Sequence, residues 1–415
     1  MTRKVVLAYS GGLDTSVAIR WLQEERGFDV IALTIDLGNE KDLQTVEQRA
    51  LQIGAIKAIV RDGKQPFIDY FAFPALMAGA VYEGGYLLAT AIGRPLIAKM
   101  LVDVAREEGA TAIAHGCTGK GNDQVRFDVS TQALAPDLEI IAPVREHRMS
   151  REEQIEWAAA RNVPVPVTKQ SSYSTDENLW GRSIEAGLLE DPWVAPPEEI
   201  YQWTRSIADA PDAPREVEIA FVQGRPHALD GQEMDGVTLV QTLNRWAGEH
   251  GVGRTDLVED RLIGIKSREI YEAPAAWTLH HAHEALEQLT LSKPQLRVKN
   301  SLRQEYADLI YNGLWFTAHH QDLAAYVQST QRHVTGTVRM RLHKGQAVPA
   351  GRKSPRSLYS YALATYDRGD QYDQGNAVGF IKIWGLPVAQ QARAQLLADG
   401  EQPFQLGTAE PDAGG

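Results

Sequence analysis

The segment Leu7-Ala8-Tyr9-Ser10-Gly11-Gly12-Leu13-Asp14-Thr15-Ser16 connects two different periodic patterns. Residues 4–8 before the turn have the length and branching of a buried strand, and residues 17–22 after it are apolar at helical spacing. A strand that turns through two glycines into a helix presents unpaired backbone N–H groups, and these groups attract an anion. Three hydroxyl side chains, at Ser10, Thr15 and Ser16, add donors. We therefore predict a phosphate site, with an ordinary helix-capping turn as the simpler alternative.

The chain lacks the motifs of two common phosphate sites. A Walker loop requires Gly-Lys-Ser or Gly-Lys-Thr, and neither tripeptide occurs in the sequence. No G-x-G-x-x-G motif follows the first predicted strand directly, so a dinucleotide fingerprint is not supported. The motif Ser-Gly-Gly-Leu-Asp-Thr-Ser instead resembles the pyrophosphate loop of ATP pyrophosphatases. Those enzymes cut ATP between the α- and β-phosphates, and the resemblance implies that this loop holds the departing pyrophosphate.

Composition excludes several classes of protein. The 415 residues suffice for two or three domains, and a formal charge of −12 disfavours a dedicated nucleic-acid surface. Cys117 is the only cysteine, so the chain forms no internal disulfide and no Cys-x-x-Cys site. No apolar run approaches the roughly 18 to 20 residues of a membrane helix. The first strand begins too early for a signal peptide to precede it. We therefore expect a cytoplasmic enzyme with no membrane attachment.

Strand and helix patterns alternate through residues 1–166, which we expect to form one domain. Predicted strands occupy residues 30–34, 55–60, 111–115 and 138–142. Predicted helices occupy residues 43–53, 95–108 and 151–161, a further helix starts near residue 67, and Pro95 lies in a predicted first turn. This alternation predicts a parallel sheet covered on both faces. Ligands of such sheets bind beyond the carboxyl ends of the strands, where Ser10 and His115 both lie.

The pattern changes after Val163-Pro164-Val165-Pro166. Residues 167–384 mix strand-like runs at 217–222 and 334–342 with a predicted helix at 279–289, which indicates an α+β domain. Residues 385–415 contain a predicted helix at 388–397, outside both cores, and a tail at 409–415 that we expect to be frayed.

A second polar constellation follows the strand predicted at residues 111–115. It reads His115-Gly116-Cys117-Thr118-Gly119-Lys120-Gly121-Asn122-Asp123-Gln124-Val125-Arg126. Its glycines let a ligand approach the backbone closely. The simpler alternative is that Asn122 and Asp123 cap a helix, but capping leaves Lys120 and Arg126 unexplained.

Together these two constellations resemble argininosuccinate synthase. Further motifs of that family occur in the same order along the chain: Tyr86-Leu87-Leu88-Ala89-Thr90 with Arg94-Pro95, Ser174-Thr175-Asp176-Glu177-Asn178-Leu179 with Ser183, His250-Gly251-Val252-Gly253-Arg254, Val258-Glu259-Asp260-Arg261, Gly264-Ile265-Lys266-Ser267-Arg268 and Tyr271-Glu272. The resemblance implies an α/β nucleotide-binding domain of the adenine nucleotide α-hydrolase type, a synthetase domain, a C-terminal oligomerisation helix and a homotetramer. It also implies a ligase of arginine biosynthesis, which joins citrulline to aspartate with ATP and Mg²⁺ and releases AMP and pyrophosphate through a citrullyl-adenylate.

The resemblance also assigns residues to each substrate. For ATP these are Ala8, Tyr9, Ser10, Gly11, Gly12, Leu13, Asp14, Thr15, Ser16, Ile35 and Gly116. For citrulline they are Tyr86, Asn122, Arg126, Ser174, Ser183, Glu259 and Tyr271, and for aspartate Thr118, Asn122 and Asp123. The catalytic candidates are Asp14, Arg94, Lys120 and Asp123, and we hypothesise that Asp123 is the general base. No dedicated metal site is expected, because Mg²⁺ would arrive with ATP and Asp14 is a candidate ligand.

Three positions depart from the family pattern. Ala91 replaces a serine whose hydroxyl would reach citrulline, so Ala91→Ser should tighten citrulline binding, unless Thr90 or a water already substitutes. Cys117 replaces a frequent alanine, which is a change between small side chains. Glu269 replaces the usual glycine two residues before Tyr271 and could displace that tyrosine.

Other functions remain open from the residues alone. An amidating or tRNA-thiolating ATP pyrophosphatase would need a glutaminase domain, or a cysteine pair and a basic face, and the sequence favours none of these. A non-catalytic nucleotide-binding module is the other alternative. A metal site at His280, His281 and His283 is disfavoured, because their spacing does not place three imidazoles on one helical face.

Overall fold

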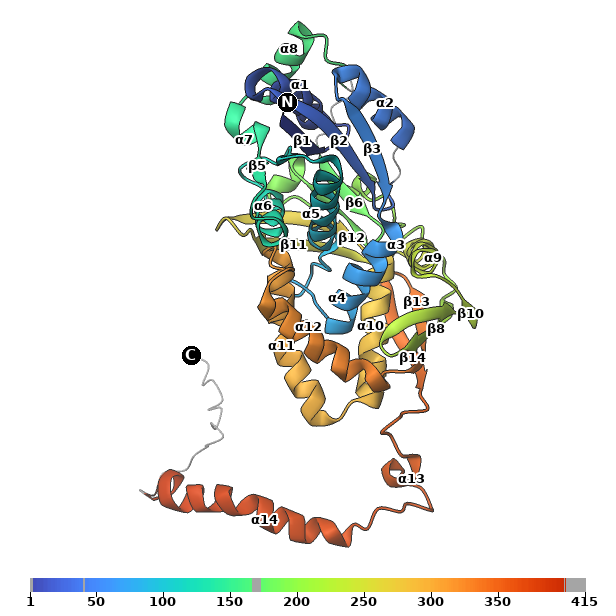
Figure 1. Ribbon diagram of the computed structural model, residues 1–415. Helices are drawn as coiled ribbons and strands as arrows, with labels where there is room; N and C mark the ends of the chain where they lie inside the picture. The colour runs from blue at the N-terminus through green and yellow to red at the C-terminus, as the bar shows by residue number, and fades with distance from the viewer. Residues whose placement is uncertain (1–2, 40–41, 166–172, 399, 401–415) are drawn as a thin grey trace, which may run out of the picture. The chain divides into compact units, whose positions relative to one another are not determined.

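The computed structural model describes residues 3–39, 42–165, 173–398 and 400 (Figure 1). The chain divides into two compact units, residues 1–358 and residues 359–415. The predicted boundary between residues 166 and 167 lies outside the described residues, as does the tail predicted to fray at 409–415.

A five-stranded parallel sheet forms the first part of the larger unit, as the alternating pattern predicted. Its strand order is β3-β2-β1-β4-β5. The strands are β1 (Arg3–Ala8), β2 (Phe28–Asp36), β3 (Lys57–Asp62), β4 (Ala112–His115) and β5 (Glu139–Ile141). Because β2 and β4 flank β1 on opposite sides, the strand order reverses at β1 and β4. This is the place where sheets of this kind bind their ligands.

Helices cover both faces of the parallel sheet, so the middle residues of its central strands β1 and β2 are buried and apolar on both faces. Val5 and Leu7 of β1 face helices α1 (Leu13–Arg26), α2 (Leu43–Ile53) and α8 (Arg151–Ala160). Val6 faces the opposite way, toward α5 (Ala89–Glu108) and α6 (Asp123–Leu134). Shorter helices are α3 (Lys64–Phe67), a π-helical turn (Ile68–Ala72), α4 (Phe73–Ala78) and α7 (Pro143–His147).

Helix α5 begins earlier than the sequence predicted. It starts at Ala89, so Pro95 lies inside the helix and not in its first turn. The physical reason is a side chain from outside the helix: the Tyr86 hydroxyl accepts hydrogen bonds from the backbone N–H groups of Thr90 and Ala91, both at 3.1 Å. These contacts satisfy donors that every helix start leaves unpaired.

Two antiparallel sheets and four long helices form the rest of the larger unit, which confirms the α+β prediction. The sheets have the orders β10-β9-β8-β13-β14 and β11-β12-β7-β6. Their strands are β6 (Ser174–Asn178), β7 (Gly181–Glu185), β8 (Arg215–Val222), β9 (Arg225–Leu229), β10 (Gln232–Glu233), β11 (Arg254–Asp260), β12 (Lys266–Glu272), β13 (Gly336–His343) and β14 (Gln346–Lys353). The helices are α9 (Gly236–Glu249), α10 (Pro274–Thr290), α11 (Lys293–Tyr311) and α12 (Ala318–Thr330), with short 3-10 turns at Gly187–Glu190, Glu198–Ile200 and Gln331–His333.

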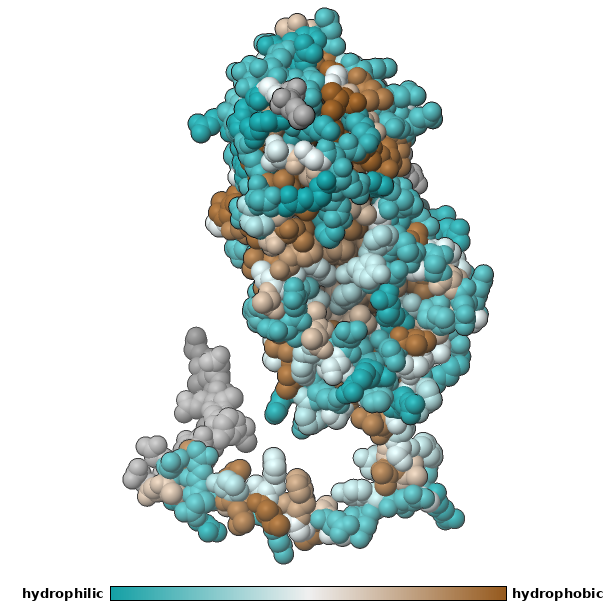
Figure 2. All heavy atoms as spheres, viewed as in Figure 1, coloured by the Kyte–Doolittle hydropathy of each residue, from teal (hydrophilic) through white to brown (hydrophobic). Residues whose placement is uncertain are grey.

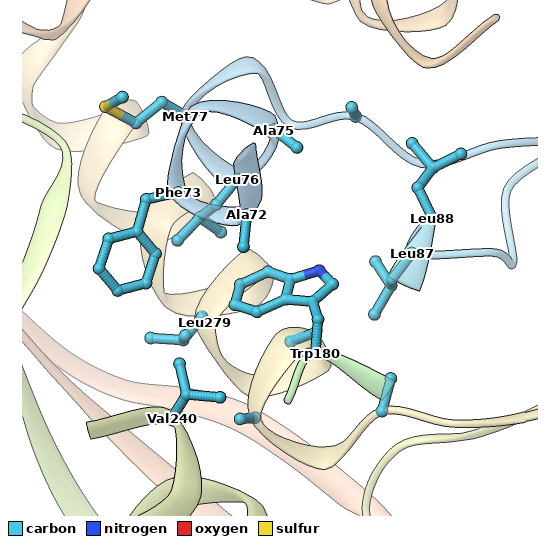
Figure 3. Packing of buried hydrophobic residues seen from close by; sticks show 14 of the residues in the cluster. Ala72, Phe73, Ala75, Leu76, Met77, Leu87, Leu88, Trp180, Val240 and Leu279 are labelled. Atoms are coloured by element: carbon cyan, nitrogen blue, oxygen red, sulfur yellow. The ribbon is translucent and has the colours of Figure 1, made fainter. Parts of the chain in front are cut away.

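The largest hydrophobic core joins segments that are far apart in the sequence. Trp180 is fully buried and lies among Phe73, Leu76, Val240 and Leu279 (Figure 3). Helix α5 packs into the same core, although its opposite end covers the parallel sheet. Helix α5 therefore connects the parallel sheet to the antiparallel part of the unit, and both parts can contribute walls to a site.

The smaller unit contains α13 (Tyr361–Ala364), α14 (Gly375–Gln391) and a π-helical turn (Ala392–Leu396). The predicted helix at 388–397 is thus one end of a longer helix that runs through Pro387, and the predicted boundary at residue 384 falls inside it. The predicted helix began only after Pro387, a residue that removes a backbone donor from the interior of α14. None of the described helices is both long and apolar enough to cross a membrane.

Candidate active site

Contacts from a neighbouring element, helix α2, fix the conformation of the turn between β1 and α1. Gly11 has a φ of +78°, and a Cβ atom there would lie 3.1 Å from Val46 Cγ2. Arg49 Nη1 donates to the Gly11 carbonyl at 2.8 Å. The hydroxyls of Ser10 and Thr15 lie 3.2 Å apart. The turn therefore has the conformation that the two glycines predicted, with two hydroxyls on one side.

Ser16 plays a different part from the other two hydroxyls. Its side chain is fully buried, and its Oγ lies 3.2 Å from the Tyr9 hydroxyl. Thr34 Oγ1 donates to the Tyr9 carbonyl at 2.9 Å, which ties the turn to β2. The Ser16 hydroxyl therefore stabilises the turn from its buried side, through its contact with Tyr9.

The end of β4 meets this turn across the switch point. A Cβ atom on Gly116 would lie 2.8 Å from Thr15 Cγ2, so only glycine fits here without a shift. His115 precedes it, with Nε2 at 2.7 Å from Asp128 Oδ1 and Nδ1 accepting the Cys117 N–H at 3.3 Å. The carboxylate defines which ring nitrogen carries the proton.

A cavity of about 260 Å³ lies at these strand ends. Six of the residues assigned to ATP line it, namely Ala8, Tyr9, Ser10, Thr15, Ile35 and Gly116. Among the described residues, Gly11, Gly12, Leu13, Asp14 and Ser16 belong to the adjoining turn and do not line the cavity. Arg94, Asp123 and Asp176 line its far wall.

A second, polar cavity of about 110 Å³ adjoins the first, because Asp123 and Asp176 line both. It contains six of the seven residues assigned to citrulline: Tyr86, Asn122, Arg126, Ser183, Glu259 and Tyr271. They come from the β4–α6 segment, the loop before α5, and strands β7, β11 and β12. Residues separated by up to 185 positions thus converge on one space.

Besides the five residues of the β1–α1 turn, three predicted site residues lie outside both cavities in the part of the chain that the structure describes. Ser174 is exposed at the start of β6, two residues before Asp176. Strand alternation places both side chains on the same face of the sheet. Thr118 and Lys120 are exposed in the glycine-rich loop before α6. Arg261 Nη1 donates to the Lys120 carbonyl at 3.4 Å, so the backbone of this loop contacts the turn after β11.

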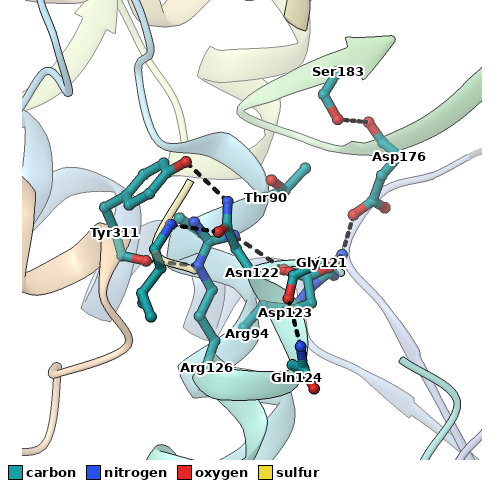
Figure 4. A network of polar contacts seen from close by, with 12 residues as sticks. Thr90, Arg94, Gly121, Asn122, Asp123, Gln124, Arg126, Asp176, Ser183 and Tyr311 are labelled. Carbon is teal, nitrogen blue, oxygen red and sulfur yellow. Dashed lines mark hydrogen bonds and ion pairs between the residues drawn. The ribbon is translucent and has the colours of Figure 1, made fainter. Parts of the chain in front are cut away.

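Asp123 lies between two arginines (Figure 4). Its carboxylate oxygens lie 2.7 Å from Arg94 Nη2 and 3.0 Å from Arg126 Nη1. Burial alone would raise the pKa of Asp123, but the two guanidinium groups outweigh it and lower the pKa to about 2. Arg94 also pairs with Asp176, so it bridges the two acids at the junction of the cavities.

Glu259 is a buried carboxylate that accepts two phenol hydroxyls. Tyr271 donates to Oε2 at 2.6 Å and Tyr311 to Oε1 at 2.5 Å. Burial raises the pKa of Glu259, while these hydrogen bonds and the nearby Arg126 lower it. The Tyr271 ring stacks on Tyr86 at 4.3 Å between centroids, so Glu269 has not displaced it from the cavity.

The comparisons with known proteins agree with this geometry. Residues 4–164 match the family model described as arginosuccinate synthase N-terminal HUP domain, and residues 173–391 match the arginosuccinate synthase C-terminal domain. The chain belongs to the argininosuccinate synthase family. An argininosuccinate synthase of Dehalococcoides mccartyi is 57% identical over 97% of this chain and 99% of its own. The argininosuccinate synthase of Brevibacillus brevis is 56% identical over 94% of this chain and 93% of its own. The argininosuccinate synthase of Symbiobacterium thermophilum is 55% identical over 95% of this chain and 98% of its own. The family consists of ATP-dependent ligases of arginine biosynthesis.

The structure adds polar-cavity residues to which the argininosuccinate synthase motifs assigned no substrate. Glu185 and Glu269 both pair with Arg261 at its wall. Burial and the neighbouring Glu185 raise the pKa of Glu269 to about 9. Ala91 is fully buried, whereas Thr90 lines the cavity with its Oγ1 at 2.6 Å from the Tyr86 hydroxyl. The glutamates and Arg261 were present in the quoted motifs or beside them, but nothing in their local pattern indicated a shared cluster.

Proposed function

We propose that this member of the argininosuccinate synthase family condenses citrulline with aspartate at the junction of the two cavities. The observation that carries the proposal is that Asp123 and Asp176 line both spaces. A nucleotide in the first cavity and an amino acid in the second would therefore meet at these acids. A reaction that joins the α-phosphorus of ATP to a ureido oxygen requires such a meeting point.

The nucleotide cavity has the groups that pyrophosphate departure requires. The ureido oxygen of citrulline attacks the α-phosphorus, and the bond to the bridging oxygen of the β-phosphate breaks. Charge then grows on pyrophosphate, and the backbone N–H groups of the turn and the Ser10 and Thr15 hydroxyls stabilise it as fixed donors. Arg94, whose Nε is buried without a partner among the described residues, adds positive charge at the junction.

Magnesium fits this site only together with ATP. Among the described residues no group of three or more His, Cys, Asp or Glu side chains could hold a metal ion. Mg²⁺ commonly uses one or two carboxylates together with phosphate oxygens and water. Asp14, half-buried in the first turn of α1, is the carboxylate beside the phosphate turn and would serve as that ligand. When bound, the ion would neutralise charge on the leaving pyrophosphate.

The polar cavity offers both signs of charge to citrulline. Arg126 is buried, and its Nη2 has no partner in the described part of the chain, so it suits an α-carboxylate. Glu259 keeps lone pairs on both oxygens beyond its two phenol hydrogen bonds and suits an α-ammonium. The ureido end would then extend toward Asp123 and the nucleotide.

Asp123 is better suited to binding the amine of aspartate than to deprotonating it. A carboxylate with a pKa of about 2 is a weak base at neutral pH. We assign it the binding of the incoming ammonium, which must lose its proton to another acceptor before attack. The free amine then attacks the ureido carbon, the bond from carbon to the AMP oxygen breaks, and argininosuccinate forms.

An isotope experiment tests the proposal directly. Citrulline labelled with ¹⁸O in the ureido group should transfer that oxygen to AMP, because it becomes the bridging oxygen of the adenylate. Product formation should require ATP, citrulline and aspartate, and ammonia should not replace aspartate. Release of ADP, or AMP without the label, would overturn the proposal.

We also propose that the smaller unit makes contacts between copies in a homotetramer. In α14 none of the side chains is buried, and Ile381, Ile383 and Trp384 are 65%, 71% and 72% exposed. Hydrophobic residues are visible on the surface of this helix in Figure 2. So many exposed apolar side chains on one helix favour a protein interface. Location in the cytoplasm remains a prediction.

A further inference from the structure

Tyr311, the last residue of α11, contacts several of the residues assigned to citrulline (Figure 4). Its hydroxyl donates to Glu259 Oε1 at 2.5 Å and accepts a hydrogen bond from Asn122 Nδ2 at 2.8 Å. Its carbonyl accepts from Arg126 Nε at 2.8 Å. Its ring meets Tyr86 edge-on at 6.2 Å between centroids. One side chain and its backbone thus contact four residues from three separate segments.

The position of Tyr311 is itself closely defined. The residue is fully buried, and its ring stacks on Tyr82 at 3.6 Å between centroids. The Arg126 guanidinium lies 4.8 Å from the same ring. A Cβ atom on Gly313 would lie 2.8 Å from Arg126 Cα, so the chain after α11 approaches α6 as closely as glycine permits.

These contacts determine how two substrate-binding groups are presented. Asn122 Oδ1 accepts the Leu262 N–H at 2.9 Å while its Nδ2 donates to Tyr311, so the amide cannot rotate without losing both bonds. Glu259 has one phenol on each oxygen, which fixes the plane of its carboxylate. Among the described residues, Tyr311 does not line the polar cavity, so it acts through these neighbours.

We propose that Tyr311 is a positioning residue, which orients the Glu259 carboxylate and the Asn122 amide for citrulline and aspartate. The inference rests on the proposed function, because it assumes that both groups bind these amino acids. The hydroxyl has two roles at once, as donor to the carboxylate and as acceptor from the amide. Phenylalanine would keep the ring contacts and lose both hydrogen bonds.

The hydroxyl should also influence the ionisation of Glu259. Seven titratable or charged side chains act on this carboxylate: Tyr82, Glu83, Tyr86, Arg126, Glu269, Tyr271 and Tyr311. Burial raises the pKa of Glu259, and the Tyr311 hydrogen bond is among the interactions that lower it. Loss of that bond destabilises the charged carboxylate, so the pKa of Glu259 should rise further.

The test compares Tyr311→Phe with Tyr306→Phe. Tyr306 is buried on the same helix, but its ring packs against His320, away from the site. For Tyr311→Phe we expect the KM for citrulline to rise about tenfold, because a hydrogen bond to a charged group is lost. The acid limb of kcat/KM for citrulline should move to higher pH. Tyr306→Phe should leave the KM and the pH profile unchanged.

A second replacement tests the same hydroxyl without removing it. 3-Fluorotyrosine at position 311 keeps both hydrogen bonds, so folding should be unaffected, and its more acidic phenol is a stronger donor. The acid limb should then move to lower pH, opposite to the shift in Tyr311→Phe. If neither replacement moves the acid limb and the KM for citrulline is unchanged, the role of Tyr311 is overturned. Wild-type protein that makes no AMP from citrulline and aspartate would instead overturn the proposed function.

Discussion

Gly116 and Thr15 touch across the switch point, where a Cβ atom on the glycine would lie 2.8 Å from the threonine methyl. The ends of β1 and β4 therefore together define the cavity that we propose for the nucleotide, since both residues line it. This contact also makes the width of the cavity sensitive to a single methyl group.

Gly116→Ala should weaken ATP binding. The added methyl must displace Thr15, and overpacking of this kind costs about 1–3 kcal/mol, so the KM for ATP should rise about tenfold or more. Steady-state kinetics with varied ATP measure the effect. Gly119→Ala is the matched control, because a Cβ atom there has nothing within 4 Å. Adding Thr15→Ser removes the clashing methyl and should restore the KM; equal values for Gly116→Ala and Gly119→Ala would contradict the geometry.

Asp123→Asn should destabilise the protein in a pH-dependent way. The pKa of Asp123 is depressed to about 2, so its ion pairs contribute stability above the unfolded pKa of about 4 and lose it as the pH falls toward 2. The wild type should exceed the variant by about 2 kcal/mol or more in free energy of unfolding near pH 6, and by much less near pH 2. Urea unfolding at a series of pH values measures this difference.

The same variant tests the assignment of Asp123 as a binding group. Its activity should fall at every pH between 6 and 9 without a change in the shape of the profile, because a group with a pKa of about 2 does not titrate there. A profile that loses one limb would restore Asp123 as a general base. Asp137→Asn, which removes an exposed pair with Arg106, is the control and should match the wild type.

Thr90→Val should raise the KM for citrulline about fivefold. The change keeps the side-chain shape and removes the hydroxyl that lies 2.6 Å from Tyr86, and a neutral hydrogen bond contributes about 1 kcal/mol. Thr278→Val removes a hydroxyl that is also buried, in α10 and outside both cavities, and should leave the KM unchanged.

Ala91→Ser tests the neighbouring position in the opposite direction. A hydroxyl at the family's serine position should lower the KM for citrulline. An unchanged or raised KM would show that position 91, which is fully buried, does not face the substrate and that Thr90 provides the contact alone.

Removal of α14 should change the oligomeric state. A chain that ends at residue 374 lacks the whole helix, whereas a cut after Trp384 would divide it. Light scattering should give a lower molar mass for the chain ending at 374. A chain ending at residue 400 keeps the helix and should have the mass of the full-length protein. An unchanged mass in both would exclude α14 from the interface.

Local patterns sufficed for much of the architecture. Strand and helix alternation predicted the parallel sheet, and the bounds predicted for α2 agree with the structure because its apolar positions repeat regularly between Asp42 and Gly54. The start of α5 was wrong, since a tyrosine hydroxyl replaces the usual capping side chain. The six cavity-lining citrulline residues were named only through the family resemblance, because no periodicity connects them.

The sequence by itself determined the glycine- and hydroxyl-rich turn and its place at the end of a buried strand, because glycines, hydroxyls and a helix start act within a few residues of one another. The tertiary structure alone decided the pairing of Arg94 with both Asp123 and Asp176, the exposure of Ser174 and the central place of Tyr311. Such contacts join residues up to 189 positions apart, for example Asn122 and Tyr311. They depend on how helices and sheets pack, and packing leaves no local periodicity in a sequence.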